Sequence, residues 1–262
     1  NESKRPIMVN LSLQPDGNFI SEKVMAMGNI GFGITCGDYD NVSYNNNGVF
    51  SIQSFLNGSL NFGYEFNTLA FDEGRYINAL IDFPRYRNTR QRVQKLFMRN
   101  PYNLSIIKTN NRNGIIELTP NFSQVYKIEV LDFFGNKTAI SIPIEYQPQT
   151  ALISEEPTIK TNYLLKANTD NNYEKDNMGV FFPAHTFYED FFLIFDVKDK
   201  VMTVHNDMVP VHSNFKITIT DTTVTNKEKT FIASVEGKRK LYNSTKFTNN
   251  TFTAYSKNLG QF

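Results

Sequence analysis

Short runs in which apolar and polar residues alternate recur along most of the chain, as expected of β-strands with one face on a core. The most sharply patterned run is Phe71–Phe83, where aromatic and aliphatic side chains alternate imperfectly with Asn78 and Asp82. A charged turn around Gly74 precedes it. We therefore predict a strand from Tyr76 onward, entered through this turn.

A hairpin is predicted just before this run. Val49–Leu56 and Leu60–Phe66 are strand-like and are separated by Asn57-Gly58-Ser59. Asn-Gly between two such runs is the strongest short-range signal for a hairpin. With the strand at Tyr76 it predicts three consecutive antiparallel strands. Similar runs predict strands over Pro6–Gln14, Leu104–Ile107, Ile115–Leu118, Val125–Leu131 and Thr138–Glu145.

The segment Pro84–Phe97 interrupts the β pattern. Proline suits a first helical turn, and Val93, Leu96 and Phe97 form a short apolar stripe at helical spacing. We predict one short helix or a structured excursion here, with the cations as its solvated face. The alternative is a contact surface for an anionic polymer, such as a cell-wall glycan or lipid head groups, or for a partner protein. The residues concerned are Arg85, Arg87, Arg90, Arg92, Lys95 and Arg99.

Two domains are predicted from the spacing of these elements. Gln147–Pro157 carries two prolines and little periodicity, which is typical of a linker. Beyond it, seven short strand-like runs follow one another, with Asn168–Asn177 expected to be a polar loop. The predicted class is all-β, with two immunoglobulin-like antiparallel β-sandwich domains over 1–146 and 158–262. The seven runs are Ile159–Leu165, Gly179–Phe182, Phe191–Val197, Val201–His205, Phe215–Thr220, Thr230–Val235 and Thr251–Tyr255.

The amino-acid composition supports a strand-rich fold and restricts the classes of binding partner. The chain has 23 Phe and 13 Tyr in 262 residues, and bulky rings favour a pleated, half-buried surface. Its 27 basic and 26 acidic residues nearly cancel, which argues against a nucleic-acid groove. No apolar run is long enough for a membrane-spanning helix. A single cysteine, Cys36, excludes an intramolecular disulfide framework.

Sites for nucleotides and metals are disfavoured by the motifs. Gly28–Asp40 is glycine-rich, but it lacks the Gly-Lys-Ser/Thr that a phosphate-binding loop needs. The histidines, His185, His205 and His212, form neither His-x-His nor His-Glu-x-x-His. His205 and His212 could meet across the intervening turn, near Asp207. A metal site there remains the less favoured reading, and no cofactor is predicted.

Acid–base and nucleophilic chemistry are disfavoured on similar grounds. Asp72 with Glu73, or Glu189 with Asp190, could be proposed as paired carboxylates. Adjacent residues on a strand point to opposite faces, so charges at turns and strand edges are the preferred reading. Cys36 has no histidine close in sequence, and we predict a packed, inert thiol.

Three stretches of the first half together resemble a known family. They are Phe71–Ala79, with Phe-Asp-Glu-Gly-Arg-Tyr-Ile-Asn-Ala, Asn100–Ser105, with Asn-Pro-Tyr-Asn-Leu-Ser, and Val130–Asn136, with Val-Leu-Asp-Phe-Phe-Gly-Asn. Phe182–Asp190 and Val209–His212 extend the likeness into the second half. These segments are similar to the C-terminal, non-catalytic β-domain region of lysostaphin-type (LytM-like) zinc metallopeptidases of Bacteroidetes.

The resemblance implies an envelope protein, periplasmic or associated with the outer membrane, whose full-length form would be a zinc-dependent peptidoglycan endopeptidase. Ser3-Lys4-Arg5-Pro6 looks like the junction just after the catalytic domain, so 1–146 would follow a missing catalytic domain. The family's zinc ligands come from a His-x3-Asp motif and a His-x-His motif. No position here matches either, so no catalytic residue is carried over.

Three hypotheses follow for the function. The first is a non-catalytic accessory region of such a peptidase, which positions the enzyme or contacts peptidoglycan or an envelope protein. The second is a non-enzymatic subunit or scaffold of an outer-envelope complex. The third and least favoured is an independent hydrolase with an unrecognised site, which a muropeptide digestion assay on this chain would reveal.

Overall fold

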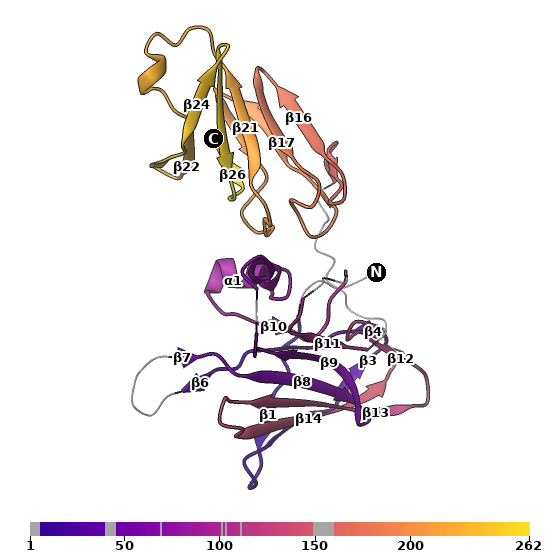
Figure 1. Ribbon diagram of the computed structural model, residues 1–262. Helices are drawn as coiled ribbons and strands as arrows, with labels where there is room; N and C mark the ends of the chain where they lie inside the picture. Colours follow the sequence, from indigo (N-terminus) through magenta and orange to yellow (C-terminus); the bar gives the residue numbers. More distant parts are fainter. Residues whose placement is uncertain are drawn as a thin grey trace. The chain divides into compact units, whose positions relative to one another are not determined.

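The computed structural model describes residues 6–39, 46–68, 70–100, 102, 104–110, 112–148 and 160–262. It is mostly β, and its strands form several sheets with predominantly antiparallel pairing (Figure 1). The chain divides into two compact units, Asn1–Pro157 and Thr158–Phe262. Most of the expected linker, 147–157, lies outside the described residues.

The first unit is built on one eight-stranded sheet, in the order β1-β2-β14-β13-β8-β9-β11, with β3 also paired to β14. Two pairings, of β14 with β2 and with β3, are parallel, so the sheet is mixed and not purely antiparallel. Its strands are β1 (Leu11–Leu13), β2 (Phe19–Ser21), β3 (Val24–Ala26), β8 (Ser51–Leu56), β9 (Ser59–Glu65), β11 (Ile107–Thr109), β13 (Ser123–Leu131) and β14 (Lys137–Tyr146).

The predicted hairpin is confirmed. β8 and β9 pair antiparallel across a two-residue turn in which Asn57 and Gly58 have φ of 48° and 83°. Positive φ at both positions is what a type I′ turn requires, and Asn and Gly tolerate it. The long hairpin of β13 and β14 is also present, joined through a turn at Asp132–Asn136.

Short elements cover one face of this sheet. They are β4 (Gly28–Ile30), β5 (Gly33–Ile34), β10 (Gln94–Lys95), β12 (Ile116–Leu118), the 3-10 helix η1 (Glu73–Asn78) and the helix α1 (Phe83–Thr89). A further pair, β6 (Asp38–Tyr39) and β7 (Asn46–Asn47), forms its own two-stranded ribbon. The core between sheet and cover includes Phe62, Tyr64, Leu80, Leu96 and Tyr126.

Buried polar contacts fasten the cover to the sheet. The amide of Asn61 on β9 donates to the carbonyl of Gly114 at 2.9 Å and accepts from Asn110 at 2.8 Å. The Tyr64 hydroxyl donates to the carbonyl of Lys95 at 2.6 Å. Gly114 has φ of +81°, and a Cβ there would lie 2.4 Å from the carbonyl oxygen of Leu96. Only glycine fits where these two layers approach most closely.

The predicted strand over Phe71–Phe83 is wrong. Glu73–Asn78 form η1, and the strand signal survives only as an isolated bridge between Ile81 and Gln94. Leu80 and Ile81 are adjacent in sequence and both buried, which a one-faced strand does not allow. Local bonds from Ala79 to Tyr76 and from Leu80 to Ile77 curl the segment into turns instead. Of the three consecutive antiparallel strands that were predicted, the structure therefore has the first two, β8 and β9, and η1 follows in place of the third.

The second unit has two five-stranded sheets, ordered β16-β17-β21-β25-β24 and β19-β20-β26-β22-β23, and every pairing in them is antiparallel. The strands of the first sheet are β16 (Asn171–Lys175), β17 (Met178–Phe182), β21 (Phe215–Thr220), β24 (Thr245–Thr248) and β25 (Thr251–Ser256). Those of the second are β19 (Phe195–Lys198), β20 (Val201–Val204), β22 (Ala233–Glu236), β23 (Arg239–Tyr242) and β26 (Gly260–Gln261). β15 (Leu164–Leu165) pairs with β18 (Phe191–Phe192), and η2 (Lys227–Lys229) is a 3-10 turn.

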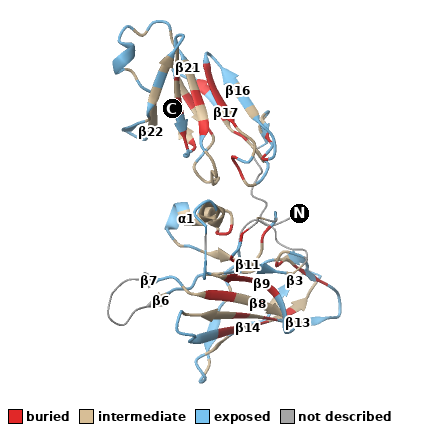
Figure 2. Cartoon of the chain, viewed as in Figure 1, coloured by how far each residue is buried: buried red, intermediate tan, exposed pale blue. Residues whose placement is uncertain are grey.

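One core lies between the two sheets. Val180, Phe182 and Ile217 from one sheet and Met202 and Val204 from the other are fully or almost fully buried. Figure 2 shows the buried residues concentrated on the central strands, while the outer strands are mainly exposed. This arrangement is a β-sandwich-like layer pair.

Three sequence expectations need correction in this unit. Within the described part of the run expected over Ile159–Leu165, only Leu164–Leu165 is a strand. Asn168–Asn177, expected to be a polar loop, contains the strand β16. Its residues are polar because β16 is an edge strand, with one neighbour and little burial. The run expected over Thr230–Val235 begins as a strand only at Ala233.

Candidate functional site

The cationic segment of the first unit begins with a capped helix. The Asp82 carboxylate accepts from the backbone N–H of Arg85 at 3.2 Å, and Pro84 lies in the first turn of α1. The helix ends at Arg90, which adopts a left-handed φ of 62° and bonds through its N–H to the carbonyl of Tyr86. The last helical residue of α1 is therefore Thr89, eight residues before the end of the predicted segment at Phe97.

The turn at Arg90 gathers two guanidinium groups around one ring. Those of Arg90 and Arg92 lie 5.8 and 5.5 Å from the centroid of the Tyr86 ring. Both distances fall within the range of cation–π attraction. Both arginines are exposed, and among the described residues neither has an acidic partner. We call Tyr86, Arg90 and Arg92 the arginine–tyrosine surface.

The other predicted contact residues do not share this surface. Arg85 donates from Nε to Gln91 at 2.7 Å and contacts the Met8 sulfur, so its guanidinium is held by local partners. Lys95 lies on β10 and donates to the carbonyl of Ala79 at 3.1 Å. Arg87 is exposed on α1, and Arg99 is exposed beyond β10.

The single helical face expected over Pro84–Phe97 is therefore wrong beyond Thr89, although the short helix is present. Leu96 is fully buried in the core between the sheet and the cover layer, where its backbone N–H donates to the carbonyl of Phe32, and it belongs to no helical stripe. Tyr86 was not recognised from the sequence. Its position four residues before Arg90 in a helix is the signal that would have identified it.

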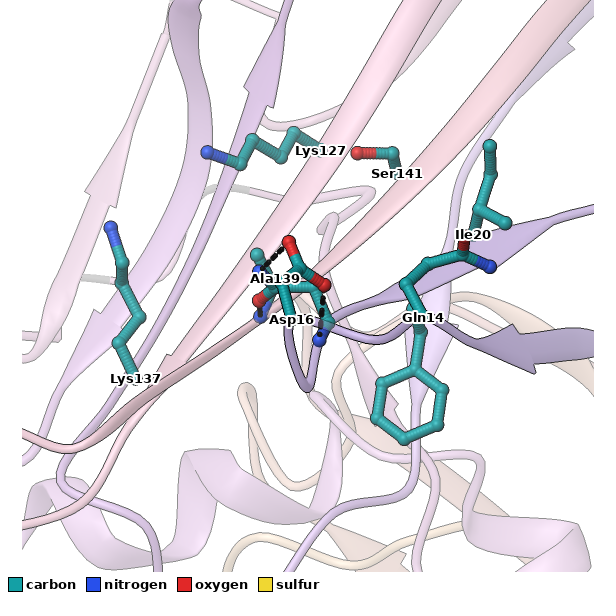
Figure 3. Close-up of a pocket in the computed structure, with 9 residues that line it drawn as sticks. Gln14, Asp16, Ile20, Lys127, Lys137, Ala139 and Ser141 are labelled. Atoms are coloured by element: carbon teal, nitrogen blue, oxygen red, sulfur yellow. Dashed lines mark hydrogen bonds between the residues drawn. The ribbon is translucent and has the colours of Figure 1, made fainter.

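A polar depression of about 310 Å³ lies elsewhere on the first unit (Figure 3). Asp16 lies in the middle of it and accepts from the backbone and side-chain N–H groups of Asn18, which lowers the pKa of its carboxyl group. Lys127 and Lys137 lie to one side, and both bind Glu129, at 2.7 and 3.4 Å. Each of these charged groups has a hydrogen-bond or ion-pair partner, and no residue proposed from the sequence lies there. The lining also includes Gln14, Phe19, Ile20, Ala139 and Ser141.

The histidines have separate partners. His205 Nδ1 accepts from the backbone N–H of Ile194 at 3.1 Å, and burial lowers the pKa of the ring. Its imidazole is thereby kept neutral. His212 Nδ1 lies 3.1 Å from the Tyr188 hydroxyl, and the backbone N–H of His185 bonds to the carbonyl of Ala167. Within the described ranges, no three His, Cys, Asp or Glu side chains are grouped as metal ligands.

Two of the four carboxylates considered for acid–base chemistry, Glu73 and Asp190, bind hydroxyl or backbone groups. Glu73 accepts from the Ser105 hydroxyl at 2.7 Å and joins η1 to the segment before β11. Asp190 accepts from the backbone N–H of Ala167 at 2.8 Å. Both contacts tie loops together, which is a structural use of these charges.

Cys36 is exposed, so the expectation of a packed thiol is wrong. Neighbouring atoms still desolvate it enough to raise the pKa of its thiol. A raised pKa favours the protonated thiol at neutral pH, and the thiol is the less nucleophilic form.

The turn between β13 and β14 carries an exposed apolar tip. Phe133 and Phe134 are 80% and 87% exposed, and Phe133 packs edge-on against Phe50. The turn is fixed by Asp132, which accepts from the backbone and side-chain N–H groups of Asn136. Large side chains this exposed on a rigid turn point to a contact.

Comparison with known families gives one match, to the Zu5-like domain, over residues 162–262. The matched region is the second unit and is less than half of the chain. Comparisons with curated proteins and with solved structures found no match. In the described part of the chain, no helix has the length and apolar character to cross a membrane.

Proposed function

We propose that this chain is a non-catalytic binding region of a cell-envelope, lysostaphin-type peptidoglycan endopeptidase, acting in the periplasm or at the outer membrane. In this proposal both units are immunoglobulin-like modules, and the first contacts the cell wall. The observation that carries it is the arginine–tyrosine surface, where two exposed cations are held over one aromatic ring.

The chemistry of this surface suits a carboxylate-bearing glycan. A guanidinium group binds carboxylates through paired N–H donors, and peptidoglycan stem peptides carry such groups. Stacking against Tyr86 also reduces the freedom of both arginine side chains before binding, so less conformational entropy is lost on contact.

The test is co-sedimentation of the full chain with purified peptidoglycan sacculi. Replacing Arg90 and Arg92 together by Ser should weaken binding at least about tenfold at low salt, and added salt should weaken wild-type binding in the same direction. The matched control replaces two other exposed cations of the first unit by Ser: Lys23 and Arg112. Equal binding by both variants would remove this surface from the proposal.

A second candidate is a non-enzymatic scaffold subunit of an outer-envelope complex. The exposed tip at Phe133 and Phe134 favours it, because partner pockets bury aromatic anchors of this kind. Replacing both by Ser should abolish capture of an envelope protein while leaving sedimentation with sacculi unchanged. The opposite pattern would exclude the tip as a protein contact.

A further inference from the structure

The two sheets of the second unit end in four edge strands, β16, β24, β19 and β23, and two of these, β16 and β23, differ in charge. β23 ends one sheet and β16 ends the other, so each pairs with one strand among the residues that the structure describes. All four residues of β23 are exposed, as are Asn172, Glu174 and Lys175 of β16. A strand edge presents a row of unpaired backbone groups that another strand can join.

The β23 edge is basic. Lys238 in the turn is followed by Arg239 and Lys240 in the strand, and across the described residues none of the three forms an ion pair. Glu236, opposite Arg239, is the one acidic residue of this hairpin. Leu241 and Tyr242 continue the strand with exposed apolar surface, and Tyr242 packs against Phe231.

The β16 edge is acidic. Glu174 in the strand and Asp176 in the following turn are exposed. The one cation of the strand, Lys175, is engaged by Asp196 at 2.5 Å. Tyr173 comes just before Glu174 in β16 and is half-buried against Phe195.

We propose that β23 of one molecule pairs antiparallel with β16 of a second molecule. The register that places Lys240 opposite Glu174 also places Leu241 opposite Tyr173. Facing residues in an antiparallel pair lie on the same side of the sheet, so one opposite-charge pair and one apolar pair form together. Lys238 and Asp176 lie in the turns that adjoin the two strands, at the same end of this pairing, and add a second attraction between opposite charges. Arg239 then faces Lys175, whose charge Asp196 already offsets.

The same charges disfavour symmetric pairing. Two copies of β23 would bring lysine and arginine against each other, and two copies of β16 would bring carboxylates together. The contact is therefore between different edges, so one molecule of the pair keeps its acidic edge and the other keeps its basic edge free for a further neighbour. Heterologous contacts of this kind build open chains unless the rotation closes a ring. A single strand pair buries little surface, so the association is weak.

The experiment is sedimentation equilibrium of the full chain at low salt, from about 10 μM to about 1 mM, the range for a weak contact. The weight-average mass should rise above the 30.1 kDa of the monomer and keep rising with concentration. K238E/K240E alone and E174K/D176K alone should each stay near the monomer mass. An equimolar mixture of the two should associate again, because each supplies the edge that the other lacks.

The control is K160E/K257E, which changes net charge as K238E/K240E does, at exposed lysines outside both strands, and should associate like the wild type. A wild-type chain that remains monomeric, or a mixture that fails to associate, would overturn the proposal. If the monomer instead bound a poly-glutamate probe through Lys238 and Lys240, the basic edge would be assigned to an acidic peptide and the proposal would also fall. Binding to sacculi is measured separately, so this outcome is independent of the proposed glycan contact.

Discussion

In the second unit, two five-stranded sheets enclose a core supplied largely by regular strands, whereas the first unit packs one large sheet against short strands, η1 and loops. The second core is held by aromatic packing, in which Phe182 contacts Tyr173, Phe187 and Phe215. The first relies in addition on buried polar contacts made by Asn61 and Tyr64. Regular strands satisfy their backbone N–H and C=O groups by pairing with one another. The irregular segments of a cover layer need hydrogen bonds from side chains to satisfy their buried backbone groups.

The largest difference in stability between the two units is expected from a change at Phe182. Its ring is fully buried, and Phe182→Ala should lower the free energy of unfolding of the second unit by about 3–5 kcal/mol. The first unit should keep its own stability, which hydrogen exchange resolved by residue would show. Tyr255→Ala is the control, because this side chain of the same sheet is 61% exposed. Equal losses in the two variants would contradict the assigned core.

The next largest effect is expected at alkaline pH, which should lower the stability of the first unit. Burial raises the pKa of Tyr126 to about 12, and burial also raises the pKa of Tyr64. An unfolded tyrosine ionises near pH 10, so the native state binds more protons above that value and its stability falls as pH rises. From pH 10 to 12, Tyr126 alone should cost the first unit about 2 kcal/mol, and the ionisation of Tyr64 adds to this loss.

Urea unfolding at pH 8 to 12 measures this loss. Tyr126→Phe should reduce it and leave stability at pH 8 nearly unchanged. The Tyr126 hydroxyl makes no hydrogen bond of normal geometry, although Ser54 and Asn61 lie near it. Tyr255→Phe serves as the exposed control. An alkaline loss that is the same in all three chains would refute the assignment.

The smallest of these effects is expected at Asn61. Asn61→Ala leaves the carbonyl of Gly114 and the amide of Asn110 without their buried partner. An unsatisfied buried group of this kind should cost the first unit about 2 kcal/mol. Asn67→Ala, which removes an exposed contact with Glu65, should change stability by less than about 0.5 kcal/mol. Similar losses at both sites would show that the cover does not depend on this amide.

Local chemistry was sufficient to predict some elements and insufficient for others. The hairpin at Asn57-Gly58 was predicted because two positive φ values select those residues wherever they occur. The prediction of a strand over Phe71–Phe83 was wrong because the apolar residues of this segment pack in an irregular cover layer, where buried positions do not follow the two-residue period of a strand. β16 and β23 were missed as strands because edge strands bury too few side chains to leave an alternating pattern.

The same distinction between local and long-range information applies to the candidate site. A cationic segment with a short helix could be predicted from Pro84 and the arginines alone. That Arg90 and Arg92 share the ring of Tyr86, while Lys95 binds the carbonyl of Ala79, depends on where α1 ends and on β10 pairing with β5. A left-handed residue at Arg90 redirects the chain, and the sequence pattern carries no signal for that redirection.

The sequence by itself determined an all-β chain, its main hairpins and the near balance of its charges, because turn residues and alternation act over a few neighbours. The tertiary structure alone decided which strands lie at edges, which cations meet an aromatic ring, and how the basic and acidic residues of the second unit separate onto β23 and β16. These features join residues distant in sequence, and long-range strand pairing leaves no periodic signal in the segments that it unites.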